Sequence, residues 1–267
     1  MGTVTESLSK AFGAFKDNWI VYIVAGLLVM VINLVLSWLL VFAGVFTIFG
    51  ISDLSAASLT NLDLDAVSST FEVTFNHLAN GDIQAVGVMA LLGALGVFLI
   101  GLLVMIPLTY GMYYMAIKGT RNEKVEIRDL FYAFSSGREY IRSITYAVLW
   151  AVILIIIGIV AALCFMLNYW VGLIVGILLY ILVSVFWFFT LYIYIMTPSE
   201  GIVYAIKRSF NNAKSNLVST VITVILVAIL TSIPLLSIIL EPYAYIYAAY
   251  VLKDIDPTLV DSSGHHN

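Results

Sequence analysis

The basic residues of this chain are confined to a few short segments, and almost everything between them is apolar. All twelve Lys and Arg residues lie in 1–18, 118–142, 207–214 and at Lys253. The segment 51–82 carries five acidic residues and no basic one. Polytopic membrane proteins gather Lys and Arg in their cytoplasmic loops. The pattern therefore predicts a multi-pass membrane protein with its basic segments in the cytoplasm and 51–82 on the other side.

The composition is far from that of a soluble protein. Hydrophobic residues make up 62% of the chain and charged residues 10%, whereas soluble domains carry about 25% charged residues. The net charge of −4 is divided between the two sides, which argues against nucleic acid as a partner. The single cysteine, Cys164, cannot form an internal disulfide or a cysteine-based metal site, and we expect it to be a packing residue.

The apolar runs set the number of membrane crossings. A helix needs about 20 mainly apolar residues to cross about 30 Å of hydrocarbon. We expect the first span within 19–49 and the second within 83–117, the second bent near Pro107. The run 140–196 is long enough for a third and a fourth span, divided by a turn at 168–170.

The last apolar run, 217–250, has two interpretations. Pro234 lies at its middle, so the run forms either a hairpin of two spans or one kinked, overlong span. Two spans bring Lys253 to the cytoplasmic side with every other basic residue. We therefore favour six spans over five in a plasma membrane protein. The N-terminus is then cytoplasmic, and with six spans the C-terminus is too.

Short amphipathic helices are predicted ahead of the odd-numbered spans. One series of apolar residues occurs at Val4, Leu8, Phe12, Phe15 and Trp19. A second series with the same spacing occurs 198 positions later, at Ile202, Ile206, Phe210, Ala213 and Leu217. This spacing places the apolar residues on one helix face and the basic ones on another, which is typical of helices lying in the headgroup plane. Residues 127–134 follow the pattern in part.

These features predict an all-α fold built as one membrane domain, 1–252. It comprises three units, each a cytoplasmic interfacial helix followed by a pair of spans: 1–119, 120–197 and 198–252. A polar tail, 253–267, follows.

The chain resembles a broad, largely uncharacterised prokaryotic family of six-span membrane proteins. The family includes the membrane domain fused to some bacterial glycerophosphodiester phosphodiesterases. The resemblance rests on the basic segment 118–142 with its Asp129-Leu130-Phe131-x-x-Phe134 core, on 205–210 with Asn216, and on a Tyr-rich final helix, 243–250. It implies a six-span fold in a bacterial or archaeal plasma membrane. It implies no catalytic residues, and without a phosphodiesterase domain we do not expect that activity.

One ionisable residue, Glu241, is expected within a span. Such residues are costly in a membrane and often mark ion or proton pathways. One interpretation makes Glu241 a proton or cation site together with Asn33 and the tyrosines of 243–250, Tyr243 and Tyr247 among them. The other makes it a hydrogen-bonded packing residue, with the tyrosines forming an aromatic stripe along one helix face.

Two further groups of residues are candidates for lipid contact and helix packing. Anionic headgroups are expected to attract the basic residues of the cytoplasmic segments. The candidates are Lys10, Lys16, Arg128, Arg138, Arg142, Lys207, Arg208 and Lys214. Gly172 and Gly176, with Gly158 on the neighbouring span, permit close helix contact, either within one chain or in a dimer.

No catalytic or cofactor motif accompanies these features. The three histidines, His77, His265 and His266, lie in the outer loop and the tail, and no HExxH motif is present. We expect no enzyme activity, no metal and no cofactor. The leading hypothesis is a membrane-organising protein or an accessory or scaffold subunit, with lipid, other membrane proteins or a second copy as partners. The alternative is a transporter or channel for a small or lipid-like substrate.

Overall fold

The computed structural model describes residues 2–48, 83–232 and 236–261, and every regular element in these ranges is a helix. The all-α prediction is therefore confirmed for this part of the chain. The acidic segment 51–82, Pro234 and the end of the tail lie outside the described residues.

The chain divides into two compact units. The large unit comprises Met1–Val29 and Ile106–Asn267, and the small unit comprises Met30–Met105. Two long helices, α2 (Trp19–Ile48) and α5 (Ile83–Thr120), each contribute to both units. In the small unit their described side chains include many exposed apolar residues, such as Trp38 and Leu99.

Four stretches of the described chain are long and apolar enough to cross a membrane. They are Trp19–Leu39, Leu99–Thr120, Gly137–Leu167 and Tyr169–Met196. These stretches match the first four predicted spans. A fifth is reached if α9 (Ile202–Ser215) and α10 (Leu217–Thr231), which meet at a bend of 107°, are counted as one broken span.

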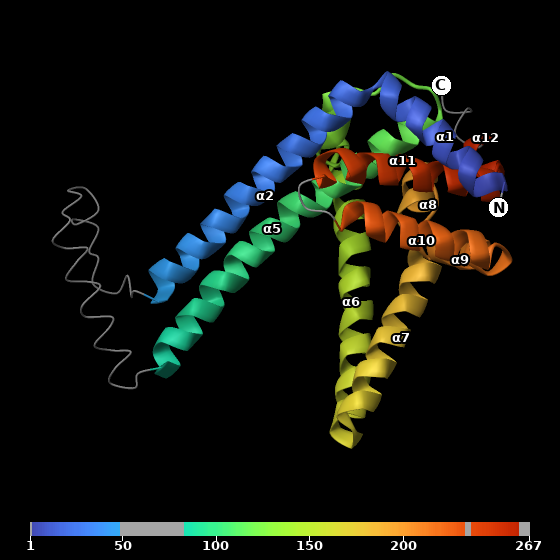
Figure 1. The fold of residues 1–267 in the computed structure, drawn as a ribbon. Coiled ribbons are helices and arrows are strands. Elements are labelled where there is room, and N and C mark those ends of the chain that lie inside the picture. Colours follow the sequence, from blue (N-terminus) through green and yellow to red (C-terminus); the bar gives the residue numbers. More distant parts are fainter. Residues whose placement is uncertain (1, 49–82, 233–235, 262–267) are drawn as a thin grey trace, which may run out of the picture. The chain divides into compact units, whose positions relative to one another are not determined.

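Helices α6 (Gly137–Leu167) and α7 (Tyr169–Trp187) form an antiparallel hairpin (Figure 1). Asn168 ends α6, and its side-chain oxygen accepts the backbone N–H of Trp170 at 2.9 Å, which caps α7. The predicted turn is thereby confirmed. Close packing at the tip depends on Gly172, because a Cβ there would lie 2.5 Å from Cγ of Phe165.

The outer surface of this hairpin is apolar and uncovered. None of the eighteen-residue apolar stretch of α6 is buried within the chain. Ile155, Ile159 and Ile174 are each more than half exposed. An apolar surface of this extent needs lipid or another protein to cover it. The hairpin is therefore suited to a membrane and not to water.

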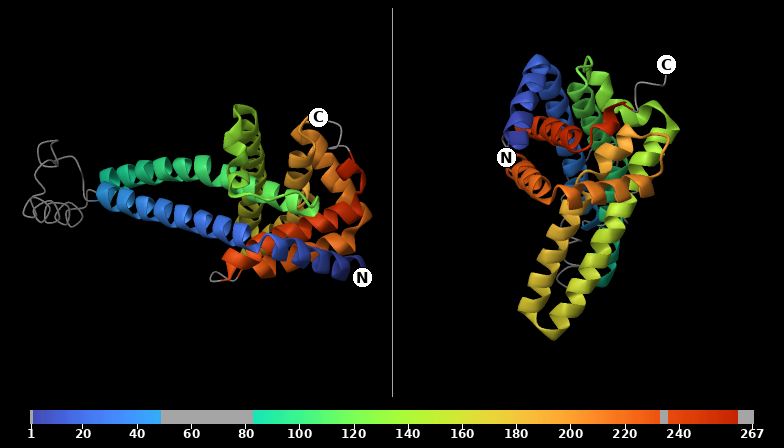
Figure 2. Two further views of the ribbon diagram at one scale, coloured as in Figure 1. Left: turned by 90° about the horizontal axis from the view of Figure 1, so that it is seen from above. Right: turned by 90° about the vertical axis from the view of Figure 1, so that its right-hand side faces the viewer.

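The last apolar run contains two helices rather than one. Helix α10 ends at Thr231, and α11 (Ser237–Ile255) begins six residues later. In Figures 1 and 2, α10 and α11 run across the α6–α7 hairpin and not alongside it. Helices also precede the first, third and fifth apolar runs: α1 (Gly2–Asp17), the 3₁₀ helix η2 (Ile127–Ser135) and α9.

Helix α11 forms the centre of the large unit. It packs against both α1 and α10, drawn in blue and orange around the red α11 in Figure 2. Residues 244–252 are all buried. The short helices α8 (Thr190–Met196) and α12 (Thr258–Asp261) lie close to each other, and α8 is buried throughout. The close approach of α5 to η2 requires Gly111, whose Cβ would meet the carbonyl oxygen of Leu130 at 1.8 Å.

The two glycines Gly172 and Gly158 provide a matched test of packing in the hairpin. A Cβ at Gly172 would overlap Phe165, whereas a Cβ at Gly158 has nothing within 4 Å. We expect Gly172→Ala to destabilise the protein by about 1–3 kcal/mol through overpacking. Gly158→Ala should be neutral or slightly stabilising, because Ala favours helix by up to about 1 kcal/mol. SDS-induced unfolding in mixed micelles measures both, and equal effects of the two substitutions would contradict the packing.

Candidate functional site

Charged side chains of the large unit gather at the ends of its helices. The first cluster joins α5 to η2. Nζ of Lys118 lies 2.8 Å from Oδ2 of Asp129, and the same oxygen accepts the backbone N–H of Glu126 at 2.8 Å. Both side chains of the pair are mostly buried. A pair of this kind fixes the position of η2 against the end of α5.

The second cluster lies at the start of α6. Oε2 of Glu139 accepts the hydroxyl of Tyr110 at 2.9 Å, and Oε1 lies 3.2 Å from Nη1 of Arg142. The guanidinium of Arg142 also donates to the carbonyl of Tyr194 and lies over its ring at 4.2 Å. Only 7% of Arg142 is exposed. The predicted contact of Arg142 with headgroups is therefore corrected, because this side chain is buried between helices.

The third cluster ties α9 to the segment after α11. Arg208 binds Asp256 through two parallel hydrogen bonds of 2.7 and 2.8 Å, and Nδ2 of Asn212 donates to the same carboxylate at 2.9 Å. Burial raises the pKa of Asp256, but the hydrogen bonds from Arg208, Asn212 and Thr258 outweigh it and lower the pKa to about 2. The carboxylate is thus ionised at neutral pH and holds α9 against the segment after α11.

The remaining headgroup candidates lie at or near the surface. Lys10 pairs with Glu6 at 2.9 Å, Arg128 pairs with Glu126 at 2.7 Å, and Arg138 donates to the carbonyl of Pro198 at 2.7 Å. The other three, Lys16, Lys207 and Lys214, are exposed. Their contact with lipid stays a prediction.

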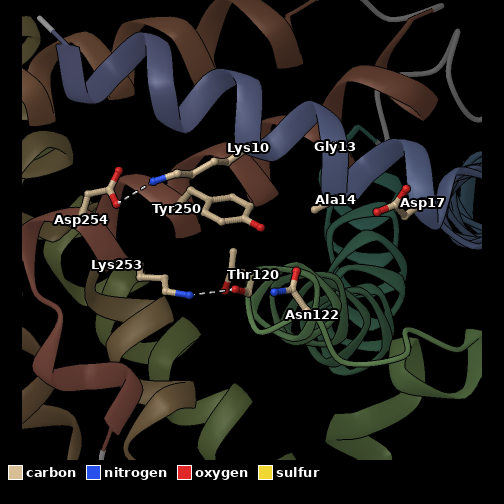
Figure 3. A pocket seen from close by; sticks show the side chains of 9 residues that line it. All are labelled: Lys10, Gly13, Ala14, Asp17, Thr120, Asn122, Tyr250, Lys253 and Asp254. Carbon is tan, nitrogen blue, oxygen red and sulfur yellow. Dashed lines mark hydrogen bonds and ion pairs between the residues drawn. The ribbon is translucent and has the colours of Figure 1, made fainter.

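A cavity of about 420 Å³ lies between α1, the end of α5 and α11 (Figure 3). Its lining residues are Lys10, Gly13, Ala14, Asp17, Thr120, Asn122, Tyr250, Lys253 and Asp254. The two lysines are engaged: Nζ of Lys253 donates to the carbonyl of Thr120 at 3.1 Å, and Lys10 faces Glu6 and Asp254. The positive and negative side chains around this cavity therefore cancel, and the cavity offers a ligand no net charge.

A second cavity, of about 570 Å³, lies between the end of α5, η2, the segment after α8, and α9. Its lining residues are Tyr114, Ile117, Arg121, Tyr132, Ile195, Met196, Thr197, Pro198, Ser199, Glu200, Tyr204, Arg208 and Thr258. We name it the arginine cavity after Arg121 and Arg208. Sequence reasoning did not single out Arg121, and no local motif links it to Arg208, 87 positions later.

Glu241 is held by one tyrosine of the Tyr-rich segment 243–250. The hydroxyl of Tyr245, one helical turn further on, donates to Oε1 of Glu241 at 2.5 Å. The ring of Tyr245 lies 4.4 Å from that of Tyr113, which in turn lies 4.7 Å from Tyr192. The i, i+4 spacing of Glu241 and Tyr245 is the signal that could have identified this contact.

The other predicted partners of Glu241 have different surroundings. Tyr243 donates to the carbonyl of Leu8 at 3.2 Å, and the hydroxyl of Tyr247 lies 3.5 Å from Oγ1 of Thr223. Asn33 is exposed on the part of α2 that belongs to the small unit. Its pairing with Glu241 stays a prediction.

Among residues 2–48, 83–232 and 236–261, no three His, Cys, Asp or Glu side chains are grouped closely enough to hold a metal ion. No protein-family model, curated protein or solved structure matches the chain.

The Arg208–Asp256 pair predicts a pH-dependent contribution to stability. The pKa of Asp256 is about 2 in the folded chain, below the value of about 3.9 for an unperturbed Asp. The pair therefore stabilises the fold fully above about pH 4 and is lost as the pH falls toward 2. We expect Asp256→Asn to lower the free energy of unfolding by about 1–2 kcal/mol at pH 7, since Arg208 is partly exposed.

Unfolding of both proteins in detergent, followed by circular dichroism from pH 7 to about pH 2.5, measures this contribution. The difference between them should shrink as the pH falls. Glu123→Gln is the control, because Glu123 is exposed and lies 3.9 Å from its nearest basic partner. A difference that stays constant over this range would contradict the role assigned to Asp256.

Proposed function

We propose that this chain is an integral membrane protein without a catalytic site, which organises the bilayer or serves as an accessory or scaffold subunit. The observation that carries the proposal is the uncovered apolar surface of α6 and α7, combined with charges concentrated at the helix ends. Buried carboxylates engage Lys118, Arg142 and Arg208 in contacts that hold helices together. These pairs give the three cations a role in the fold.

We further propose that α1, η2 and α9 lie in the headgroup region on the cytoplasmic side of a plasma membrane. Exposed Phe12, Phe134 and Phe210 supply apolar contact from the three helices. Exposed Lys16 and Lys214 stand at the ends of α1 and α9, where anionic headgroups would meet them. The proposed partners are therefore anionic lipids, with other membrane proteins or a second copy against the apolar flanks.

The proposal includes six spans, and with them membership of the family that the sequence resembles. The division of the last run into α10 and α11 supports this count. With 15 residues, α10 is about 22 Å long, shorter than the hydrocarbon core of about 30 Å. In a six-span protein the bilayer must therefore thin locally around α10. Helices α10 and α11 must also lie alongside α6 and α7 instead of across them.

Thiol labelling tests this topology. In a Cys164→Ala background we expect Tyr169→Cys, at the tip of the exposed hairpin, to react with a membrane-impermeant reagent in intact cells. Asn122→Cys and Pro257→Cys should react only after the membrane is opened, because both would be cytoplasmic in a six-span protein. Labelling of Pro257→Cys in intact cells would reduce the count to five, and identical behaviour of Tyr169→Cys and Asn122→Cys would refute the orientation.

A transporter is the second candidate function, and the surroundings of Glu241 are the observation that favours it. A carboxylate that accepts the hydroxyl of Tyr245, whose ring adjoins Tyr113, has the chemistry of a proton or cation site. Neither cavity described above is lined by Glu241 or Asn33. The chemistry of the residues around Glu241 therefore favours transport, whereas no path observed among the described residues does.

Reconstitution separates the two functions. For an organising protein we expect proteoliposomes to show no proton or cation flux above protein-free vesicles, and dye-labelled phosphatidylglycerol to cluster around the protein. Replacing Lys16, Lys207 and Lys214 by Gln should reduce the clustering, because these exposed lysines attract the headgroups. Flux that is abolished by Glu241→Gln and kept by Leu240→Ala would overturn the proposal in favour of transport.

A further inference from the structure

The arginine cavity contains a cation whose charge is poorly compensated. Nε of Arg121 is buried and has no hydrogen-bond partner among the described residues. Its nearest carboxylate, that of Glu123, lies 3.9 Å from Nη1 and is 47% exposed, whereas Arg121 is 19% exposed. A mostly buried cation beside a solvated anion recovers little of its cost of desolvation. Nε itself is closed to solvent, so a negative charge in the cavity would offset this cost through the guanidinium as a whole.

The second arginine of the cavity is fixed in place. Arg208 is bound on one side by both oxygens of Asp256 and also donates to the hydroxyls of Tyr204 and Thr258. Its charge is largely neutralised by Asp256, so it contributes orientation more than net charge. The only acid of the lining, Glu200, is exposed and therefore screened by solvent.

The rest of the lining suits an oxyanion. Ser199 and Tyr204 supply hydroxyl groups, whereas the hydroxyl of Thr258 already donates to Asp256. The rings of Tyr114 and Tyr132, 3.7 Å apart, form a stacked aromatic wall. A planar guanidinium with neighbouring hydroxyls is the usual recognition chemistry for phosphate. One uncompensated positive charge matches a singly charged phosphodiester or phosphate group.

We propose that the arginine cavity binds a phosphate group, with Arg121 as the principal contact and Arg208 as a fixed second donor. The group comes either from an anionic lipid headgroup or from soluble phosphate. The site rests on the geometry of the cavity and not on the span count, and its lipid-headgroup form rests on the proposed membrane function.

The test uses the full chain in nanodiscs of pure phosphatidylcholine, titrated with inorganic phosphate and followed by its thermal unfolding temperature. A second arm compares nanodiscs with and without phosphatidylglycerol and counts retained lipid by native mass spectrometry. If phosphate binds, Arg121→Gln should weaken the affinity for phosphate by about tenfold or more, because a charged hydrogen-bond donor is removed. Arg128→Gln, an equal change of charge at an exposed arginine outside the lining, should leave it unchanged.

Each outcome has a distinct meaning. Stabilisation by inorganic phosphate that depends on Arg121 supports the site with a soluble ligand. Retention of phosphatidylglycerol that depends on Arg121, without an effect of inorganic phosphate, supports it with a lipid headgroup. Arg121→Lys keeps the charge and provides a second variant if Arg121→Gln fails to fold; it should retain part of the binding. The absence of both effects, or equal losses in Arg121→Gln and Arg128→Gln, would overturn the proposal.

Discussion

The large unit depends on polar contacts made at the ends of its helices. Apolar flanks such as those of α6 attract lipid as readily as they attract one another, so they specify little about which helices meet. Specific contacts require charge or close backbone approach. The chain uses both: carboxylates pair with Lys118, Arg142 and Arg208, and glycines allow contact at Gly111 and Gly172. The ion pairs lie where the chain leaves its apolar runs, since a charge placed deeper would be expensive in hydrocarbon.

Local features of the sequence were sufficient for several elements of this fold. The turn at Asn168 was predictable because Asn caps a helix and interrupts an otherwise continuous apolar run. A division of the last apolar run was expected because Pro interrupts helices, and α10 ends at Thr231 before α11 begins at Ser237. The number of crossings stays a prediction. Gly172 faces the neighbouring helix, as small residues at close contacts do, whereas Gly158 has open space around it. These signals act over a few residues, and a sequence displays them directly.

Contacts between distant segments were not predictable in the same way. Arg142 was expected at the surface as part of a basic segment, yet α8 covers it and the carbonyl of Tyr194 accepts its hydrogen bond. Arg121 meets Arg208 at one cavity only because the first half of α9 lies near the end of α5. No periodicity or motif encodes such a meeting.

The basic residues illustrate why a charge pattern identifies a class of protein and not a function. The positive-inside rule counts every Lys and Arg alike, because the cost of moving a charge across the bilayer depends little on its neighbours. In the folded chain the same residues have three different surroundings. Arg142 and Arg208 are held by carboxylates and join helices, Lys16 and Lys214 face outward, and Arg121 is mostly buried with only a solvated acid nearby. A paired cation contributes to the fold and an exposed one to orientation, so we assign ligand binding to the cation that is poorly compensated.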